Sequence, residues 1–240
     1  MQIAYQHEGH KALHSHPFIN RLHSGSIRKE QVARFFQDRV YVFRILEDLL
    51  MGSGALFPKD QNLSEEMKAL FLRSRAYESD LLQLHGIKEH ELSNADIMPP
   101  SEAAFKYIST LHDAETETAA LHLWLFLVGE TFGAQSMGGS IHKKFPTTGL
   151  NATNFGNFEL WNVRKIYTDW INQRFIEAIP ELDNRELLPN EVKDAEIEIG
   201  RAYEAILKMF DAANETPRVS CCNRIRSLFN QSLHDLFKVE

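Results

Sequence analysis

The sequence predicts an all-α protein that folds as a single domain. Almost every segment of the 240 residues repeats its apolar positions with the helical period, and none keeps the alternation of apolar and polar residues that marks a strand. Glycine and proline stand at the ends of several of these segments, where helices start and stop. A chain of this length suits one domain with a substantial core, and its 43% hydrophobic and 25% charged residues are ordinary for a globular protein.

The first half of the chain predicts three helices. A short amphipathic segment covers residues 3–16 and carries several histidines. A long helix with one apolar face covers residues 32–50, after a start at Gly25-Ser26. A third helix covers residues 67–84, and Gly86 is its expected C-terminal cap, because glycine readily adopts the left-handed conformation that ends many helices.

The second half predicts four helices and one long loop. Ser101 follows the break at Pro99-Pro100 and is the expected N-cap of the first of these helices. The loop is expected at residues 138–157, which are rich in Gly, Thr and Asn and contain a proline. The helices are expected at residues 101–111, from about 117 through 133, at 158–178 and at 189–212.

The composition changes near the C-terminus. Residues 1–215 form the expected helical domain, and residues 216–240 form a separate tail. An apolar stripe at helical spacing in this tail predicts a terminal helix that docks on the core or on a second subunit, or an amphipathic helix that seeks a surface. Cys221 and Cys222 are the two cysteines of the chain; as neighbours they cannot staple a fold, which favours a reducing compartment.

Charge and hydropathy exclude several classes of protein. A formal net charge of -7 argues against a general nucleic-acid binder, which needs a basic surface. The polar, histidine-rich N-terminus is not a signal peptide, and the most apolar run, residues 119–128, is too short to span a bilayer. We therefore expect a soluble, cytoplasmic protein without a transmembrane segment.

Two glycines interrupt the most apolar helix. Gly129 and Gly133 are one helical turn apart, and each costs roughly 1 kcal/mol relative to alanine in a helix interior. One explanation is a flat, bulky ligand that lies against bare backbone at this point. The other is close packing of two helices.

A cluster of histidines lies near the N-terminus. His7, His10 and His14 are spaced i, i+3 and i+7 and share one face of the predicted helix, whereas His16 lies off that face. A neutral imidazole is a good ligand for heme iron and for other metals. The spacing therefore allows one heme ligand, a non-heme site of three histidines, or a solvated helix face.

Several features of the chain follow one another in a known order and spacing. They are His10, Phe18, the turn at residues 22–25, the long helix through residues 41–48, the segment 105–112, His122, and the motif at residues 128–135. Over residues 3–212 they resemble the heme oxygenase family, in which an axial histidine lies below the heme. The segment at residues 128–135 is similar to that family's distal motif, Leu-Gly-Asp-Leu-Ser-Gly-Gly-Gln.

The resemblance implies a fold and a set of site residues. It implies a single-domain helical bundle with heme sandwiched between the first, proximal helix and a glycine-kinked distal helix. His10 would bind the iron, and Gly129 and Gly133 would leave room on the distal side. Glu130, which stands where the family has Asp, would order water, while Phe132 and Ala134 replace smaller residues of the family motif.

The resemblance also implies contacts at the rest of the heme. Tyr107 and Tyr167 are expected to contact it, and Arg164, which matches a family lysine, is expected to bind a propionate. Two first-helix lysines of the family are replaced by Ile3 and His7. This departure affects heme affinity and heme orientation.

The implied activity is the oxygen- and reductant-dependent cleavage of heme to biliverdin, carbon monoxide and ferrous iron. Heme is both prosthetic group and substrate in this reaction. Electrons would come from an external donor, a ferredoxin, a flavodoxin or a flavin reductase. The protein is expected to act as a monomer or a weak dimer.

Other functions of the same fold remain open. One is a heme sensor or carrier without catalysis. Another is a non-heme di-iron oxidase, which needs several carboxylates and histidines inside the bundle, although the chain has no paired Glu-x-x-His motif. A thiamin-degrading enzyme would need a cysteine in the core. The residues available for di-iron are Glu47, Asp48, Glu78, His85, His112 and Glu115.

Overall fold

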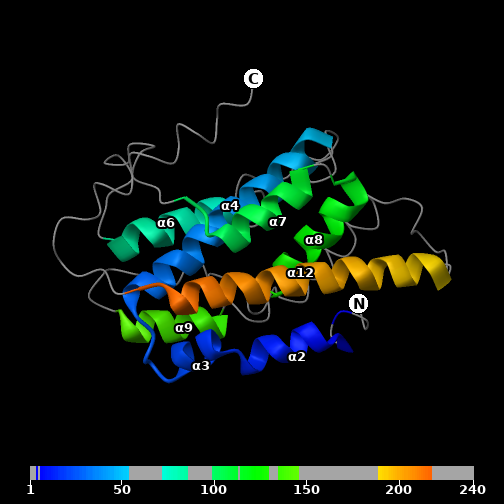
Figure 1. Ribbon diagram of the computed structural model, residues 1–240. Helices are drawn as coiled ribbons and strands as arrows, with labels where there is room; N and C mark the ends of the chain where they lie inside the picture. The colour runs from blue at the N-terminus through cyan, green and yellow to red at the C-terminus, as the bar shows by residue number, and fades with distance from the viewer. Residues whose placement is uncertain are drawn as a thin grey trace, which may run out of the picture.

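The computed structural model describes residues 4, 6–53, 72–85, 99–112, 114–129, 135–145 and 189–217, and all secondary structure in these residues is helical (Figure 1). This confirms the predicted all-α class. The helices are α2 (Glu8–Ser15), α3 (Pro17–His23), α4 (Lys29–Ser53), α6 (Arg73–His85), α7 (Glu102–His112), α8 (Thr116–Gly129), α9 (Gln135–Lys144) and α12 (Pro189–Glu215).

The two longest described helices organise the bundle. α4, of 25 residues, packs against α6, α7, α8 and α12. α12, of 27 residues, runs between this group and the N-terminal pair α2 and α3, as Figure 1 shows. The core between them is aromatic, with Phe18, Phe35, Phe36, Phe43, Tyr77, Phe126 and Phe210 all buried.

Local sequence explains where two of the helices begin. Gly25 has a φ of 69°, which favours glycine, and it turns the chain between α3 and α4. Ser101 is the N-cap of α7, as predicted, and accepts a hydrogen bond from Ala104 N at 3.1 Å. The buried Asp38 of α4 in turn accepts bonds from Ser101 N at 2.7 Å and from Ser101 Oγ at 2.6 Å. α4 thereby fixes the position at which α7 starts.

A buried carboxyl group performs the same task at the start of α6. Glu47 of α4 accepts hydrogen bonds from Ser74 N at 3.0 Å and from Ser74 Oγ at 2.5 Å. Burial raises the pKa of Glu47 to about 7, although the bonds from Ser74 oppose the shift. This contact makes the packing of α4 on α6 sensitive to pH.

The predicted loop at residues 138–157 is wrong at its start. α9 continues through Gly138 and Gly139 to Lys144. Ile141 is fully buried and Met137 packs against the core, so tertiary burial outweighs the helix propensity that the glycines lose.

Some predicted elements lie outside the described residues. These are the start of the helix at 67–84 with its cap Gly86, the helix at 158–178, and the C-terminal tail from residue 218 with both cysteines. In the part of the chain that the structure describes, no helix is long and apolar enough to cross a membrane.

Candidate functional site

α2 approaches α12 unusually closely. A Cβ added to Gly9 would lie 2.5 Å from Tyr203 Cβ, which is closer than real side chains approach. His7 is the N-cap of α2, and its Nδ1 accepts a hydrogen bond from Gly9 N at 3.0 Å. The hydroxyl of Tyr203 donates to Ala4 O at 3.0 Å. These contacts place the first helix directly on α12.

The three histidines that were predicted to share one face are used differently. His7 lies before the helix, so the prediction that all three are helical is wrong for this residue; its ring stacks on Tyr203 with centroids 5.4 Å apart. His10 is half-buried, 6.1 Å from Tyr203, and the exposed His14 meets it edge-on at 4.8 Å. Among the described residues no three side chains of His, Cys, Asp or Glu form a group that could hold a metal, so the non-heme site of three histidines gains no support there.

We predict that Gly9→Ala displaces α2. The new methyl group would overlap Tyr203, and overpacking of this kind typically costs about 1–3 kcal/mol. Thermal unfolding should report this loss. Gly139→Ala is the matched control, since no described atom lies within 4 Å of its added Cβ. Equal stability of Gly9→Ala and the parent protein would contradict the close packing of α2 on α12.

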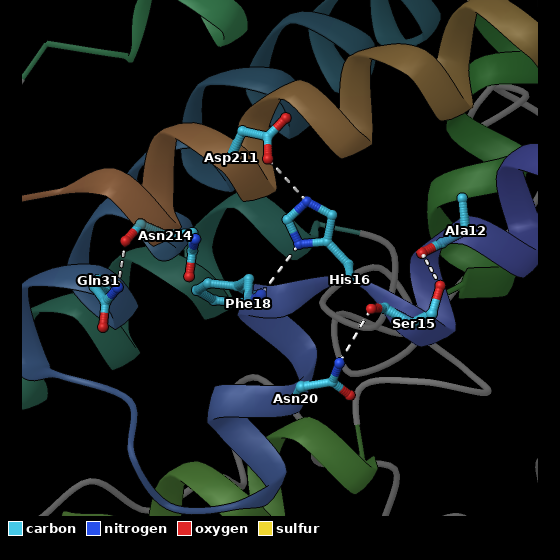
Figure 2. A network of polar contacts seen from close by, with 8 residues as sticks. All are labelled: Ala12, Ser15, His16, Phe18, Asn20, Gln31, Asp211 and Asn214. Carbon is cyan, nitrogen blue, oxygen red and sulfur yellow. Dashed lines mark hydrogen bonds and ion pairs between the residues drawn. The ribbon is translucent and has the colours of Figure 1, made fainter.

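A buried histidine fixes the break between α2 and α3 (Figure 2). His16 caps α3: its Nδ1 accepts a hydrogen bond from Phe18 N at 3.1 Å, and its Nε2 lies 3.1 Å from Asp211 Oδ1. A proton on Nε2 satisfies both contacts. Phe18 is fully buried and stacks on Phe210 with centroids 5.1 Å apart. The polar link and the aromatic pair together hold the N-terminal helices on α12.

The distal glycines are described in part. α8 ends at Gly129, which is exposed, and no described atom lies within 4 Å of a Cβ added there. Helix packing therefore does not explain Gly129 within the described residues. Glu130 and Gly133 lie outside the described residues, as do Arg164 and Tyr167.

A chain of polar side chains crosses three helices beside α8. The hydroxyl of Tyr107 in α7 lies 2.5 Å from Nδ1 of His122 in α8, and His122 Nε2 lies 3.3 Å from Oε2 of Glu198 in α12. Glu198 also accepts a hydrogen bond from Arg201. Burial lowers the pKa of His122, while Glu198 opposes the shift, and burial raises the pKa of Tyr107. A neutral His122 therefore accepts from Tyr107 and donates to Glu198.

An arginine lies in the core close to this chain. Arg39 of α4 is only 6% exposed, and its guanidinium carbon lies 4.6 Å from the ring centroid of Phe126. Its Nη1 has no hydrogen-bond partner among the described residues. Sequence reasoning missed this residue, although a charged side chain on the apolar face that holds Phe35 and Phe43 could have revealed it.

The residues considered for a di-iron site are used otherwise or are exposed. Glu47 binds Ser74, and Glu78 binds Arg44 at 2.7 Å. Asp48, His85, His112 and Glu115 are exposed. Within the described residues these side chains do not gather in the bundle.

Three groups in the described residues have chemistry that a ligand with an iron centre and negative charge would need. His10 offers an imidazole from the half-buried face of α2. Gly129 offers open backbone at the end of α8, and Arg39 offers a buried positive charge with one unpaired nitrogen. These three groups come from three separate helices.

Comparison with known proteins gives the fold but no relative in sequence. No protein-family model and no curated protein matches the sequence. Among solved structures, heme oxygenase from Leptospira interrogans matches with a TM-score of 0.64 and 18% identity, over 88% of this chain and 100% of that chain. Heme oxygenase-1 from the cyanobacterium Synechocystis sp. PCC6803, solved in complex with heme, matches with a TM-score of 0.65 and 15% identity, over 88% of this chain and 90% of that chain. The chain has the heme oxygenase-like all-α fold.

Proposed function

We propose that this protein is a heme oxygenase, which cleaves heme to biliverdin, carbon monoxide and ferrous iron with oxygen and an external reductant. The observation that carries the proposal is the position of His10 in the sequence and in the fold. The resemblance aligns it with the family's axial histidine, and in the heme oxygenase-like fold it lies half-buried on α2, beside Tyr203. Two solved structures of the same fold are heme oxygenases, and one of them is a complex with heme.

The proposed site residues would lie on two sides of the heme. Bound heme would supply both the redox-active iron and the ring that is cleaved. His10 would hold the iron from the α2 side. Gly129 leaves open backbone at the end of α8, and with Gly133 it would make room on the other side. Glu130 would order the water that delivers protons.

Contacts at the edge of the ligand complete the proposed site. Arg164 would neutralise a heme carboxylate, and Tyr167 and Tyr107 would contact the ring. The hydroxyl of Tyr107 is bound to His122, so Tyr107 would act from a fixed position. A ferredoxin, a flavodoxin or a flavin reductase would supply electrons to the iron.

Optical spectra of the hemin-loaded protein during addition of ascorbate in air test the proposal. Decay of the Soret band with growth of biliverdin absorption is the expected result. A stable Soret band would leave heme binding but not catalysis and would favour a sensor or carrier, an alternative that the missing first-helix lysines at Ile3 and His7 also favour. Absence of any Soret shift with hemin would remove heme from the function altogether.

We predict that Glu130→Ala retains heme but loses turnover efficiency. Removing a group that positions a proton donor typically lowers a rate by about 10²–10⁴-fold, while the iron ligand stays in place. Single-turnover formation of biliverdin should be compared with that of Glu196→Ala, a control at an exposed position on α12. An unchanged biliverdin yield and rate in Glu130→Ala would show that this carboxylate has no part in the reaction.

A further inference from the structure

Arg39 is a buried cation held between three aromatic rings. Its guanidinium carbon lies 4.6 Å from the ring centroid of Phe126 in α8, 5.3 Å from that of Phe35 in α4, and 5.9 Å from that of Phe210 in α12. Ring faces attract a cation, but each such contact contributes only about 0.5–2 kcal/mol. A charged group that leaves water loses several kcal/mol of hydration, so the rings alone do not balance its burial.

The carboxylate next in sequence forms no close ion pair with Arg39, although the charge of Arg39 lowers the pKa of Asp38 against the larger effect of burial. Asp38 directs both oxygens to Ser101, which it holds at 2.7 and 2.6 Å, and its nearest arginine contact is Arg34 at 4.0 Å. Arg39 Nη1 is buried without a hydrogen-bond partner in the part of the chain that the structure describes. Natural proteins rarely leave such a donor unused, and an anionic ligand would satisfy it.

The ring contacts indicate on which side of the candidate site this charge lies. Phe126 is one helical turn before Gly129, so Arg39 lies beside the helix that carries the open backbone position. Tyr107 stacks on the same Phe126 ring with centroids 5.9 Å apart. The cation therefore lies against α8, the helix that ends at Gly129.

We propose that Arg39 is an anion-binding residue of the distal pocket, and that its guanidinium donates a charge-assisted hydrogen bond to a small anion bound to the heme iron. This inference rests on the proposed function. A heme carboxylate is a less suitable partner, because Arg39 is 6% exposed and lies among apolar rings, whereas carboxylates of the ring edge require solvent or several cations. Arg39 then sets how strongly the pocket stabilises negative charge on the ligand of the iron.

Anion binding to the full-length, hemin-loaded protein tests this role. Sodium fluoride supplies a small anionic ligand for ferric iron, and imidazole supplies a neutral one; both affinities are measured optically. Replacing Arg39 by Met keeps much of its length but removes the charge. We expect Arg39→Met to lower fluoride affinity by roughly 10- to 100-fold, because hydrogen bonds to charged groups contribute about that factor. The ratio of fluoride to imidazole affinity should fall by a similar factor.

Two further variants keep the test decisive. Arg44→Met is the matched control on the same helix: this arginine faces α6, where it binds Glu78 at 2.7 Å, so fluoride affinity should not change. Arg39→Gln is neutral but retains hydrogen-bonding groups, and it should also bind fluoride less tightly. It takes the place of Arg39→Met in the test if that variant does not fold. Apoprotein of Arg39→Met should unfold at the same or a higher temperature, since replacing an uncompensated buried charge by an apolar group is often neutral or stabilising.

The outcomes separate the inference from the function on which it rests. If the parent protein does not bind hemin, the proposed function and this inference both fail. If hemin binds but the ratio of fluoride to imidazole affinity is the same in Arg39→Met and Arg39→Gln as in the parent protein, only the inference fails. A fall in hemin affinity with an unchanged ratio would assign Arg39 to a heme carboxylate and would also overturn it.

Discussion

His10→Ala is expected to abolish the spectrum of histidine-ligated hemin. Loss of an outer-shell partner alone costs about 10- to 100-fold in metal affinity, so loss of the ligand itself should weaken hemin binding by more than about 100-fold. Soret titration measures this change, and added imidazole should restore a ligated spectrum by entering the space that the side chain leaves. An unchanged spectrum in His10→Ala would refute the assignment of the iron ligand.

The structure also supplies controls for this experiment. His16 is committed through both ring nitrogens, to Phe18 N and to Asp211, and Nδ1 of His7 caps α2. Neither ring can bind iron without losing a contact that holds the N-terminal helices. His14 is exposed and meets His10 edge-on, so His14→Ala is the matched variant. It should retain the ligated spectrum. Loss of that spectrum in His14→Ala but not in His10→Ala would assign the iron to His14 instead of His10.

Glu47→Gln is expected to remove a large pH dependence of stability. Burial raises the pKa of Glu47 in the folded protein from 4.5 to about 7. The folded state therefore keeps its proton to higher pH than the unfolded state, and the free energy of unfolding falls as the pH rises through this window. A shift of this size corresponds to about 3 kcal/mol, present below pH 4.5 and lost above pH 7.

Denaturant unfolding at pH 4.5 and pH 8 measures this effect. Glutamine has no charged form and can still bond to Ser74, so Glu47→Gln should be more stable than the parent at pH 8 and nearly equal to it at pH 4.5. The difference between the two proteins cancels the titration of other groups. Glu115→Gln, at an exposed position, should follow the parent at both pH values. A difference that does not depend on pH would show that Glu47 is not protonated in the folded state.

Helical structure was predictable because its causes are local. Apolar residues at helical spacing indicated α4, α8 and α12, and the hydroxyl of Ser101 marked the start of α7. Gly25 was predicted to start a new segment, and its positive φ is a property of the residue itself. The prediction failed at α9, because the burial of Ile141 depends on the helices around it.

The candidate site was predictable only in part. Sequence spacing selected a cluster of histidines, and the family resemblance selected His10 within it. Its half-buried position beside Tyr203 depends on the docking of α2 on α12, which residues far apart in the sequence produce. The structure likewise decided the roles of His7 and His16, because a cap forms only where a helix starts.

By itself the sequence determined the all-α class, the histidine-rich first helix and most helix positions within the described residues. These properties follow from side-chain periodicity and backbone preference within a few residues of each position. Only the tertiary structure decided which polar groups are buried together. In the sequence, Arg39 is one of several charged residues within a predicted helix. In the structure, Phe126 and Phe210 from two other helices enclose it. The free energy of a buried charge depends on its surroundings, and those surroundings exist only after the helices pack.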